Sequence, residues 1–295
     1  MIESIDPFPW FLNKDVEIKV SGRAANMHIR SSEWSDIWRP LLSRIHDFMR
    51  QFSDRLVIGI AGPPAAGKTY FAAQLEWLAS KGFLPGARGR AVPMDGFHLP
   101  QEILTSRRIR FEDGTSITLA QCKGIPATFD AQSLREHLML AHDHSAQLDW
   151  PDYDRTTHRV VPQAIRIKKS DNIVIVEGNY LFLDVHPYDR MPDFFDLRIY
   201  VDCPAPAIIS GLVNRHTTGG KTLEEAKDWV RRVDLPNARL IERTRDAAHL
   251  IVRRDQERVI AELCWRTPKA SSDSAVGAAA VSSPPTTVQA TSESA

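Results

Sequence analysis

Gly62-Pro63-Pro64-Ala65-Ala66-Gly67-Lys68-Thr69 fits the pattern G-x-x-x-x-G-K-[ST] at every fixed position. Two glycines let the backbone turn tightly, so that consecutive N–H groups point inward at a triphosphate. A helix that begins near Gly67 adds its positive N-terminal end to this cradle. In such a motif Lys68 reaches the β- and γ-phosphates, and the hydroxyl of Thr69 ligates Mg²⁺. The stretch therefore predicts a phosphate-binding loop (P-loop), against the alternative of a chance turn rich in glycine and alanine.

The residues on either side of this loop support the prediction. The stretch Leu56-Val57-Ile58-Gly59-Ile60-Ala61 is short, apolar and β-branched, as expected of a buried parallel strand. After the loop, Phe71, Leu75 and Leu78 fall on one face of a predicted helix. A strand, a glycine-rich loop and a helix in this order are the context in which the motif binds a nucleotide.

Composition and charge limit the class of protein. The chain has 295 residues, 43% apolar and 25% charged, which suits one large globular domain with appendages or two small ones. Its formal net charge of +0 favours neither a nucleic-acid nor a membrane partner. Three cysteines without paired spacing argue against a zinc or disulfide framework and favour a cytoplasmic protein. We see no secretory signal, and no apolar run reaches the ~18 residues of a membrane span.

From residue 55 onward, strand and helix patterns alternate. The predicted strands are 55–61, 91–95, 172–177, 197–202 and 249–253. The predicted helices are 67–80, 130–142, 204–215, 223–234 and a last one from Pro236 to about residue 246, with Asp234 as its cap and a Thr222–Glu225 capping box before residues 223–234. This alternation predicts a P-loop α/β protein: a three-layer α/β/α sandwich with a mostly parallel sheet, a small lid, and a site at the carboxyl ends of the strands.

We divide the chain into an N-terminal extension (1–52), a P-loop domain (53–265) and a tail (266–295). Residues 269–295 contain no aromatic side chain and little charge, so they cannot bury enough apolar area to offset the entropy of ordering. The tail is therefore predicted to be disordered.

The N-terminal extension has two readable segments. Residues 16–20 alternate as a short edge strand does, and residues 33–52 are predicted to be helical with Ser32 as N-cap, although Pro40 argues against an unbroken helix. The apolar residues of this helix form one stripe and are predicted to be core: Trp34, Ile37, Trp38, Leu41, Leu42, Ile45 and Phe48.

Two acids come at the ends of predicted strands. Asp95, followed by Gly96, comes at the end of the second strand, where it can take the proton of an attacking hydroxyl or hold Mg²⁺ through water. Glu177 follows an apolar strand that resembles a Walker B element, where it can hold the metal or orient a water. The alternatives are a turn-forming Asp-Gly pair and a buried acid paired only for structure.

A basic segment follows the fourth predicted strand and its helix. Arg215 precedes the flexible stretch Gly219-Gly220-Lys221, and the next helix carries Arg231 and Arg232. Such a segment can close over phosphates and exclude water. Each arginine by itself also suits a solvated surface.

Two loop-rich segments, 123–130 and 150–159, combine aromatic, hydroxyl and charged side chains that suit a polar small molecule. His158 alone would more often be structural, so its candidacy depends on its neighbours. Together, the motifs resemble the phosphoribulokinase/uridine kinase family of P-loop small-molecule kinases, which includes bacterial pantothenate kinases of this fold. The blocks that carry the resemblance, in the family's order, are 62–69, Met94-Asp95-Gly96-Phe97-His98-Leu99, Lys123-Gly124-Ile125-Pro126-Ala127-Thr128-Phe129-Asp130, Val176-Glu177-Gly178-Asn179-Tyr180-Leu181, Arg215-His216 and Asp234-Leu235-Pro236-Asn237-Ala238.

The resemblance implies a role for each matching residue. Asp95 would be the catalytic base, with Lys68, Glu177 and Arg215 as the other catalytic residues, and Thr69 and Glu177 would hold Mg²⁺. Residues 62–69 would bind ATP through Gly62, Pro63, Pro64, Ala65, Ala66, Gly67, Lys68 and Thr69. The acceptor site would be lined by Phe97, His98, Tyr153, His158 and Tyr180. The similarity is greatest to a subgroup labelled nucleoside/nucleotide kinase or fructose-transport-system kinase.

The chain departs from the uridine kinase pattern at two places. Gly96-Phe97-His98 stands where uridine kinases have Ser-Phe-Tyr, and Val160 stands where they have an arginine, with Arg159 one place early. The first block is nearer to that of pantothenate kinases. Uridine specificity is therefore not predicted.

The sequence predicts an ATP- and Mg²⁺-dependent kinase that acts on a hydroxyl of a small metabolite: a sugar, a nucleoside or a pantothenate-like alcohol. It needs no nucleic-acid or membrane partner, and a homodimer is left open. One alternative is a nucleotide-dependent switch or NTPase that acts on a protein partner. Another is a nucleoside-monophosphate kinase that binds the acceptor phosphate through Arg107, Arg108 and Arg110.

Overall fold

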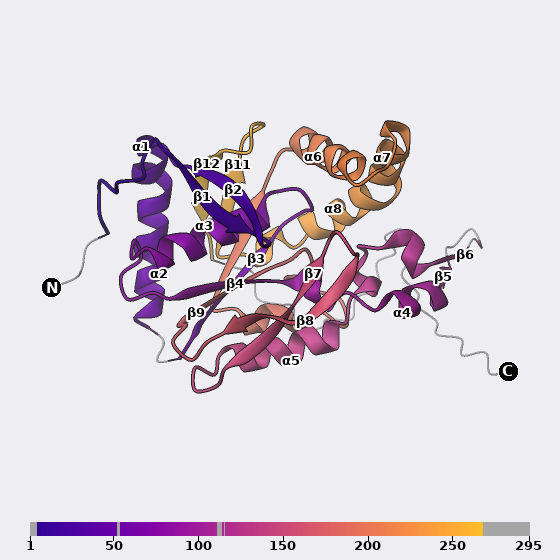
Figure 1. The fold of residues 1–295 in the computed structure, drawn as a ribbon, viewed down its shortest axis with the longest axis horizontal. Helices are drawn as coiled ribbons and strands as arrows, with labels where there is room; N and C mark the ends of the chain where they lie inside the picture. Colours follow the sequence, from indigo (N-terminus) through magenta and orange to yellow (C-terminus); the bar gives the residue numbers. More distant parts are fainter. Residues whose placement is uncertain (1–4, 52–53, 111–113, 115, 268–295) are drawn as a thin grey trace.

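A six-stranded sheet forms the centre of the molecule (Figure 1), in the strand order β12-β11-β10-β3-β9-β4. The computed structural model describes residues 5–51, 54–110, 114 and 116–267. β12 is antiparallel to its neighbour, and the other strands are parallel. The mostly parallel sheet predicted from the sequence is therefore confirmed. The strands are β3 (Leu56–Ala61), β4 (Gly89–Pro93), β9 (Ile173–Glu177), β10 (Leu197–Asp202), β11 (Leu250–Arg254) and β12 (Ile260–Trp265).

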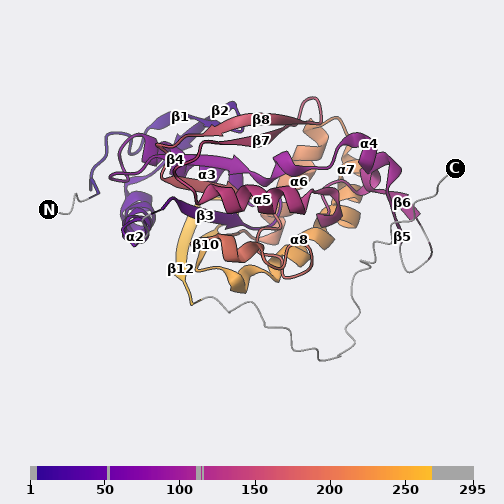
Figure 2. The same ribbon diagram turned by 90° about the horizontal axis from the view of Figure 1, so that it is seen from below.

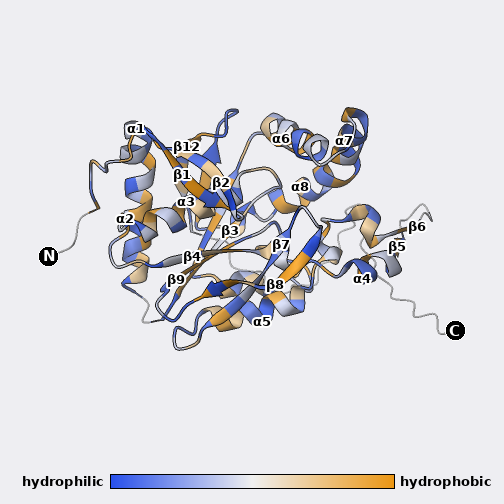
Figure 3. Ribbon diagram, in the orientation of Figure 1, coloured by the Kyte–Doolittle hydropathy of each residue, from blue (hydrophilic) through white to orange (hydrophobic). Residues whose placement is uncertain are grey.

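Alternation along β3 divides the core into two layers. Ile58 and Ile60 join a hydrophobic cluster with α3 (Lys68–Ser80), whereas Val57 and Ala61 join a second cluster with α5 (Ala131–Ala141). Successive side chains of a strand point to opposite faces, so helices cover both faces of the sheet. Along α5, hydrophobic and hydrophilic residues alternate as in a helix with one face on the core (Figure 3). The three-layer α/β/α architecture is confirmed.

The second strand ends earlier than predicted. β4 covers Gly89–Pro93 instead of 91–95, and a 3₁₀ turn, η2 (Met94–Phe97), follows it. The turn is required because β7 packs directly on it: a Cβ on Gly96 would overlap the backbone carbonyl of Pro151. Asp95 therefore lies in a tight turn beyond the strand, at the carboxyl edge of the sheet.

The last two predicted helices form one continuous run, which residues 219–222 separate from the helix before it. α6 (Ala205–Thr218) is followed by α7 (Leu223–Trp229), the π turn η6 (Val230–Asp234) and α8 (Leu235–Glu242). The Thr222–Glu225 capping box before α7 is confirmed. The prediction that Asp234 caps a separate helix is wrong, since its backbone is helical and its carboxylate contacts His216 instead. A short 3₁₀ turn, η7 (Arg245–Ala247), leads into β11.

Two segments of short elements lie between β4 and β9, one on each side of α5 in the chain. The first contains α4 (Gln101–Ser106), β5 (Arg108–Arg110), β6 (Ser116–Thr118), η3 (Leu119–Cys122) and η4 (Pro126–Thr128). The second, after α5, is the antiparallel hairpin of β7 (Leu148–Asp154) and β8 (Arg159–Ile167). Residues 123–130 and 150–159, which were predicted to be loop-rich, lie in these two segments, and much of 150–159 is strand. After β9, η5 (Met191–Phe194) precedes β10.

The N-terminal extension packs on the same core as α3. β1 (Asp15–Val20), which contains the predicted strand, pairs with β2 (Arg23–His28), and α1 (Ser31–Glu33), the π turn η1 (Trp34–Trp38) and α2 (Arg39–Met49) follow. Figure 2 shows the β1–β2 and β7–β8 hairpins along one rim of the molecule, where Arg23 Nη2 donates to Thr156 Oγ1 at 3.1 Å. The boundaries proposed near residues 52 and 265 stay predictions, and the tail predicted to be disordered lies outside the described residues from 268 onward.

The predicted helix of the extension is confirmed, but its start differs. The helix begins at Ser31 after Arg30, so Ser32 is not the N-cap. Trp34 and Trp38 are buried, at 1% and 0% exposure, which confirms the predicted core stripe. The π turn lies just before Pro40, and η6 likewise lies just before Pro236; because proline lacks an N–H, a wider turn accommodates it within a helical run.

Arg55, just before β3, joins two backbone segments, residues 141–146 and 168–171. Its guanidinium is buried and donates to the carbonyl oxygens of Ala141, Ala146, Lys168 and Asp171 at 2.7–3.3 Å. We expect Arg55→Met to lower the free energy of unfolding by about 3–5 kcal/mol, because it leaves buried acceptors without a donor. Urea denaturation followed by circular dichroism measures the loss. Arg50→Met, at an exposed position, is the matched control, and a loss equal to the control's would contradict the prediction.

Candidate active site

The P-loop connects β3 to α3 in a conformation that requires its glycines. Gly67 has a φ of 90°, and Gly62, at a φ of 149°, lies so close to β10 that a Cβ would be 2.5 Å from the Val201 carbonyl oxygen. Both backbones therefore exclude larger residues. The loop ends at Lys68, the first residue of α3, so its N–H groups and the helix N-terminus face the same side.

Lys68 lies over the loop and is almost fully buried. Its Nζ donates to the Pro63 carbonyl oxygen at 2.9 Å and to Asn179 Oδ1 at 2.7 Å. Burial lowers the pKa of Lys68 to about 8, although the charges of Glu177 and Asp95 act in the opposite direction. An anionic phosphate at this position would favour the charged form and raise the pKa again.

This pKa predicts a pH dependence of ATP binding. Below about pH 8 the free protein already holds the Lys68 proton, whereas above it a proton must be taken up when the triphosphate binds. We therefore expect the affinity for Mg·ATP to fall above about pH 8, by up to about tenfold per pH unit. Calorimetric titration between pH 7 and pH 10 measures it. A flat profile, or the same fall in Lys68→Met, would rule out Lys68 as the titrating group.

Glu177 and Thr69 form an oxygen-rich pair beside Lys68. Glu177 ends β9, and its Oε1 accepts a hydrogen bond from the Thr69 hydroxyl at 3.0 Å. Burial and the nearby Asp95 charge raise the pKa of Glu177. A hydroxyl and a carboxylate are hard oxygen donors of the kind that Mg²⁺ prefers, and a cation here would favour the ionised form. The side chains present therefore fit a magnesium ion carried in with ATP.

Asp95 lies next to Glu177 because their strands are neighbours. Pro93 of β4 pairs with Glu177 of β9, so η2 starts beside the Glu177 side chain. Asp95 Oδ2 accepts a hydrogen bond from Arg155 Nη2 at 2.7 Å. Burial acts to raise the pKa of Asp95, but the positive charges nearby, that of Arg155 above all and that of Lys68, hold the pKa below its ordinary value. Asp95 is thus a carboxylate at neutral pH.

Arg155 and Lys123, for which the sequence predicts no individual role, lie beside predicted site residues. Arg155 is at the tip of the β7–β8 hairpin, and Lys123 Nζ donates to the Tyr153 hydroxyl at 2.7 Å. In the sequence, each of the two residues lies within a segment predicted to suit a polar small molecule, 123–130 or 150–159. Hairpin pairing brings Tyr153 and Arg155 to the same edge as Asp95, and no sequence pattern shows that pairing.

Of the predicted acceptor residues, His98 and Tyr153 lie together. The His98 ring is 4.0 Å from the Phe129 ring and 4.8 Å from the Tyr153 ring, between centroids. Its Nδ1 lies 2.8 Å from the Asp95 carbonyl oxygen, so Nδ1 carries the proton. Burial lowers the pKa of His98, which keeps the ring neutral and leaves Nε2 as an acceptor.

The other predicted acceptor residues lie elsewhere. Phe97 is buried against Trp150, with ring centroids 5.2 Å apart. Tyr180 is also buried, and its hydroxyl donates to the Gly124 carbonyl oxygen at 2.5 Å. His158 is exposed at the hairpin tip, with a φ of 56°. Phe97 and Tyr180 are thus part of the core next to the site. Direct contacts of Phe97, Tyr180 and His158 with a substrate stay predictions.

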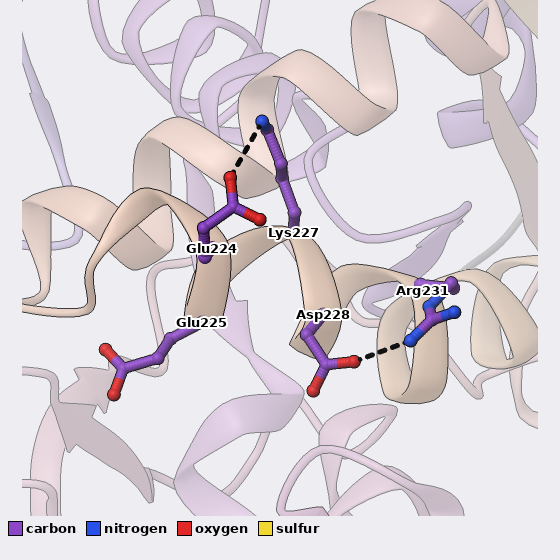
Figure 4. Close-up of a pocket in the computed structure, with 5 residues that line it drawn as sticks. All are labelled: Glu224, Glu225, Lys227, Asp228 and Arg231. Carbon is purple, nitrogen blue, oxygen red and sulfur yellow. Dashed lines mark hydrogen bonds and ion pairs between the residues drawn. The ribbon is translucent and has the colours of Figure 1, made fainter.

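The basic lid contains one arginine that faces the site and two that do not. Burial and the neighbouring Arg155 lower the pKa of Arg215, which also interacts with the Asp95 charge. Arg231 and Arg232 instead form ion pairs with Asp228 on the exposed side of the lid. Next to them, a shallow depression on α7 is lined by paired charges, Glu224 with Lys227 and Asp228 with Arg231 (Figure 4).

The arginines of the nucleotide-kinase alternative do not converge on Asp95. Arg107, Arg108 and Arg110 are exposed, and Arg108 donates to the Ser116 carbonyl oxygen across the β5–β6 pair at 2.6 Å. Nothing in the described part of the chain directs them at the acceptor side. This alternative gains no support from the structure.

The parallel sheet, the P-loop and the acids at neighbouring strand ends define a P-loop phosphotransferase. The chain belongs to the phosphoribulokinase/uridine kinase family, whose sequence pattern matches residues 57–261. It is therefore a small-molecule kinase, of a family whose members use ATP. No helix among the described residues combines the length and the apolar character needed to cross a membrane.

Individual relatives agree with this assignment. The chain is 30% identical to the uncharacterised protein YggC of Escherichia coli K12 over 244 residues, which cover 82% of this chain and 96% of YggC. It is 31% identical to a pantothenate kinase of Shouchella clausii, over 63% of this chain and 62% of that enzyme. Among solved structures, a candidate fructose transport system kinase from Silicibacter sp. TM1040 superposes with a TM-score of 0.57 at 25% identity, over 68% of this chain and 94% of that one.

Proposed function

We propose that this protein transfers the γ-phosphate of ATP to a hydroxyl group of a small metabolite, with Asp95 as the general base. The observation that carries the proposal is the convergence of Lys68, Glu177 and Asp95 at the carboxyl edge of adjacent strands. A kinase needs its donor, its metal and its base within reach of one another, because catalysis is mainly positioning and charge neutralisation.

Each residue has a part in the reaction. The acceptor hydroxyl oxygen attacks the γ-phosphorus, the bond from that phosphorus to the β,γ-bridging oxygen breaks, and ADP leaves. Asp95 takes the hydroxyl proton, and Lys68 and Arg215 stabilise charge on the transferred group. Thr69 and Glu177 would hold the Mg²⁺ that arrives with ATP, which neutralises charge on the phosphate oxygens when bound.

The acceptor class, the cellular location and the partners of the enzyme are part of the same proposal. The acceptor is a sugar, a nucleoside or a pantothenate-like alcohol, and the enzyme works in the cytoplasm without a nucleic-acid or membrane partner. The pantothenate kinases among the relatives favour an acceptor of that size and polarity. The proposal leaves open whether the chain forms a homodimer.

Transfer of labelled γ-phosphate from Mg·ATP to a panel of such acceptors tests the proposal. We expect at least one acceptor to become phosphorylated and to stimulate ADP release. A nucleotide-dependent switch would instead release ADP with water as acceptor and change its affinity for a protein partner. Phosphate transfer to none of the panel, together with acceptor-independent ADP release, would reject the kinase proposal in favour of that alternative.

A further inference from the structure

Two basic side chains, Arg155 and Lys123, lie on the acceptor side of the site. Arg155 and Lys123 both face Asp95, which is the carboxylate that interacts with each of them. Arg155 donates to Asp95 through Nη2, and within the described residues Lys123 has no carboxylate at ion-pair distance. Glu177 and Asp152 also act on Arg155, whereas Asp95 is the carboxylate that acts on Lys123, whose hydrogen-bond partner is the neutral Tyr153 hydroxyl.

Hydrogen bonds from neighbouring side chains fix the loop that carries Lys123. The Tyr180 hydroxyl donates to the Gly124 carbonyl oxygen, and the Gly124 N–H donates to Thr128 Oγ1 at 3.1 Å. Tyr188 then donates to the Pro126 carbonyl oxygen at 2.8 Å. Buried aromatic residues thus fix the backbone from which Lys123 projects. A surface lysine without a ligand would need no such support.

Lys123 belongs to the acceptor side and not to the ATP side. Its Nζ contacts the hydroxyl of Tyr153 and lies 4.7 Å from that ring centroid, and its charge acts on Asp95 and His98. The charges that act on Lys68 are those of Glu177, Asp95, Arg215 and Arg155. Arg155 thus interacts with both halves of the site, whereas Lys123 interacts with the acceptor half.

Partial burial makes the charged form of Lys123 less favourable, and a bound anion can offset this. Desolvation lowers its pKa, and the Tyr153 hydroxyl is a neutral partner that cannot balance the charge. A ligand anion beside Nζ would balance it and would accept charge-assisted hydrogen bonds from both Lys123 and Arg155.

We propose that the acceptor carries an anionic group, a carboxylate or a phosphate, that binds between Lys123 and Arg155. The proposal rests on the proposed function, since it concerns the second substrate of the same reaction. The anion competes with Asp95 for the Arg155 guanidinium, so that acceptor binding frees the Asp95 carboxylate to take the hydroxyl proton. Water and neutral alcohols leave the Asp95–Arg155 pair in place, which suppresses wasteful hydrolysis of ATP.

Matched acceptors that differ in the anion test this proposal on the full chain with saturating Mg·ATP. The pairs are glycerate and glycerol, pantothenate and pantothenol, and ribose 5-phosphate and ribose; the first two pairs probe a carboxylate and the third a phosphate. We expect the anionic member of at least one pair to have a kcat/KM more than tenfold above that of its neutral partner. Equal or better use of the neutral members would overturn the inference and leave the kinase proposal standing.

Variants of Lys123 locate the anion site. Lys123→Gln is expected to raise KM for the anionic acceptor about 10- to 100-fold, the worth of a charged hydrogen bond, with a much smaller change in KM for ATP. Lys123→Arg should recover a substantial part of the loss. Lys169→Gln, at an exposed position after β8, is the control. A change in KM for ATP as large as that for the acceptor would place Lys123 on the donor side and overturn the inference.

A separate binding measurement covers the outcome in which no acceptor is phosphorylated. That outcome would reject the proposed function but not the anion site. Thermal shift with saturating Mg·ADP and added inorganic phosphate or glycerate then decides. Stabilisation that is present in the wild type and lost in Lys123→Gln supports the anion site, whereas no shift, or the same shift in both proteins, rejects it.

Discussion

Replacement of Asp95 by asparagine is expected to lower kcat for phosphate transfer by about 10²- to 10⁴-fold, the usual contribution of a general base. The amide keeps the shape of the carboxylate but cannot take the acceptor proton. KM for ATP should change little, because Asp95 lies on η2 beyond the P-loop. Steady-state kinetics with the best acceptor of the panel measures the loss.

Two comparisons make this result interpretable. Asp47→Asn, at an exposed position of α2, controls for the loss of one negative charge. Circular dichroism and thermal unfolding check that the variant folds, because the Arg155 pair is also lost. If Asp95→Asn kept wild-type kcat while folded, Asp95 would not be the base, and the Asp95–Arg155 pair would be structural.

Replacement of Lys68 by methionine is expected to reduce kcat/KM for ATP by about 10²- to 10³-fold, since one charged donor to the transferred phosphate is lost. The same variant should be no less stable than the wild type. Burial of the Lys68 ammonium already lowers its pKa to about 8, so removal of the charge removes that unfavourable burial. Activity and stability are thus expected to move in different directions.

Kinetics and urea denaturation of the same preparation measure both quantities. Lys14→Met, at an exposed position before β1, is the control for loss of a lysine. A Lys68→Met protein that lost activity only in proportion to a loss of folded protein would argue that Lys68 supports the P-loop backbone through Pro63 and not the phosphate.

Much of the donor half could be predicted from the sequence because its signals are local. Residues 56–69 contain the strand, the turn and the start of the helix, and each is fixed by nearby residues: β-branched side chains, glycines and an apolar helical stripe. The Thr222–Glu225 capping box is equally local and was confirmed. Even the errors were local in origin. Ser32 and Asp234 are good cap residues, but the first helix begins one residue earlier, at Ser31, and Asp234 lies in a π turn inside a helical run.

The acceptor half depends on contacts between residues far apart in the chain. Arg155 reaches Asp95 across 60 positions, and Lys123 reaches Tyr153 across 30. His158 lies in the same hairpin as Arg155, but it is exposed at the tip, because the turn directs successive residues to different sides. The sequence motif predicts a segment that lies beside Asp95, but it cannot show which side chains of that segment face Asp95.

The sequence by itself determined the P-loop, the mostly parallel sheet and two acids at strand ends, because each of these follows from short-range periodicity and backbone geometry. The tertiary structure alone decided which cations meet Asp95. Packing of the β7–β8 hairpin on Gly96 brings Arg155 to the base, and a loop held by Tyr180 brings Lys123 to Tyr153. The strength of these electrostatic contacts depends on distance and burial, and both are set only when remote segments pack together.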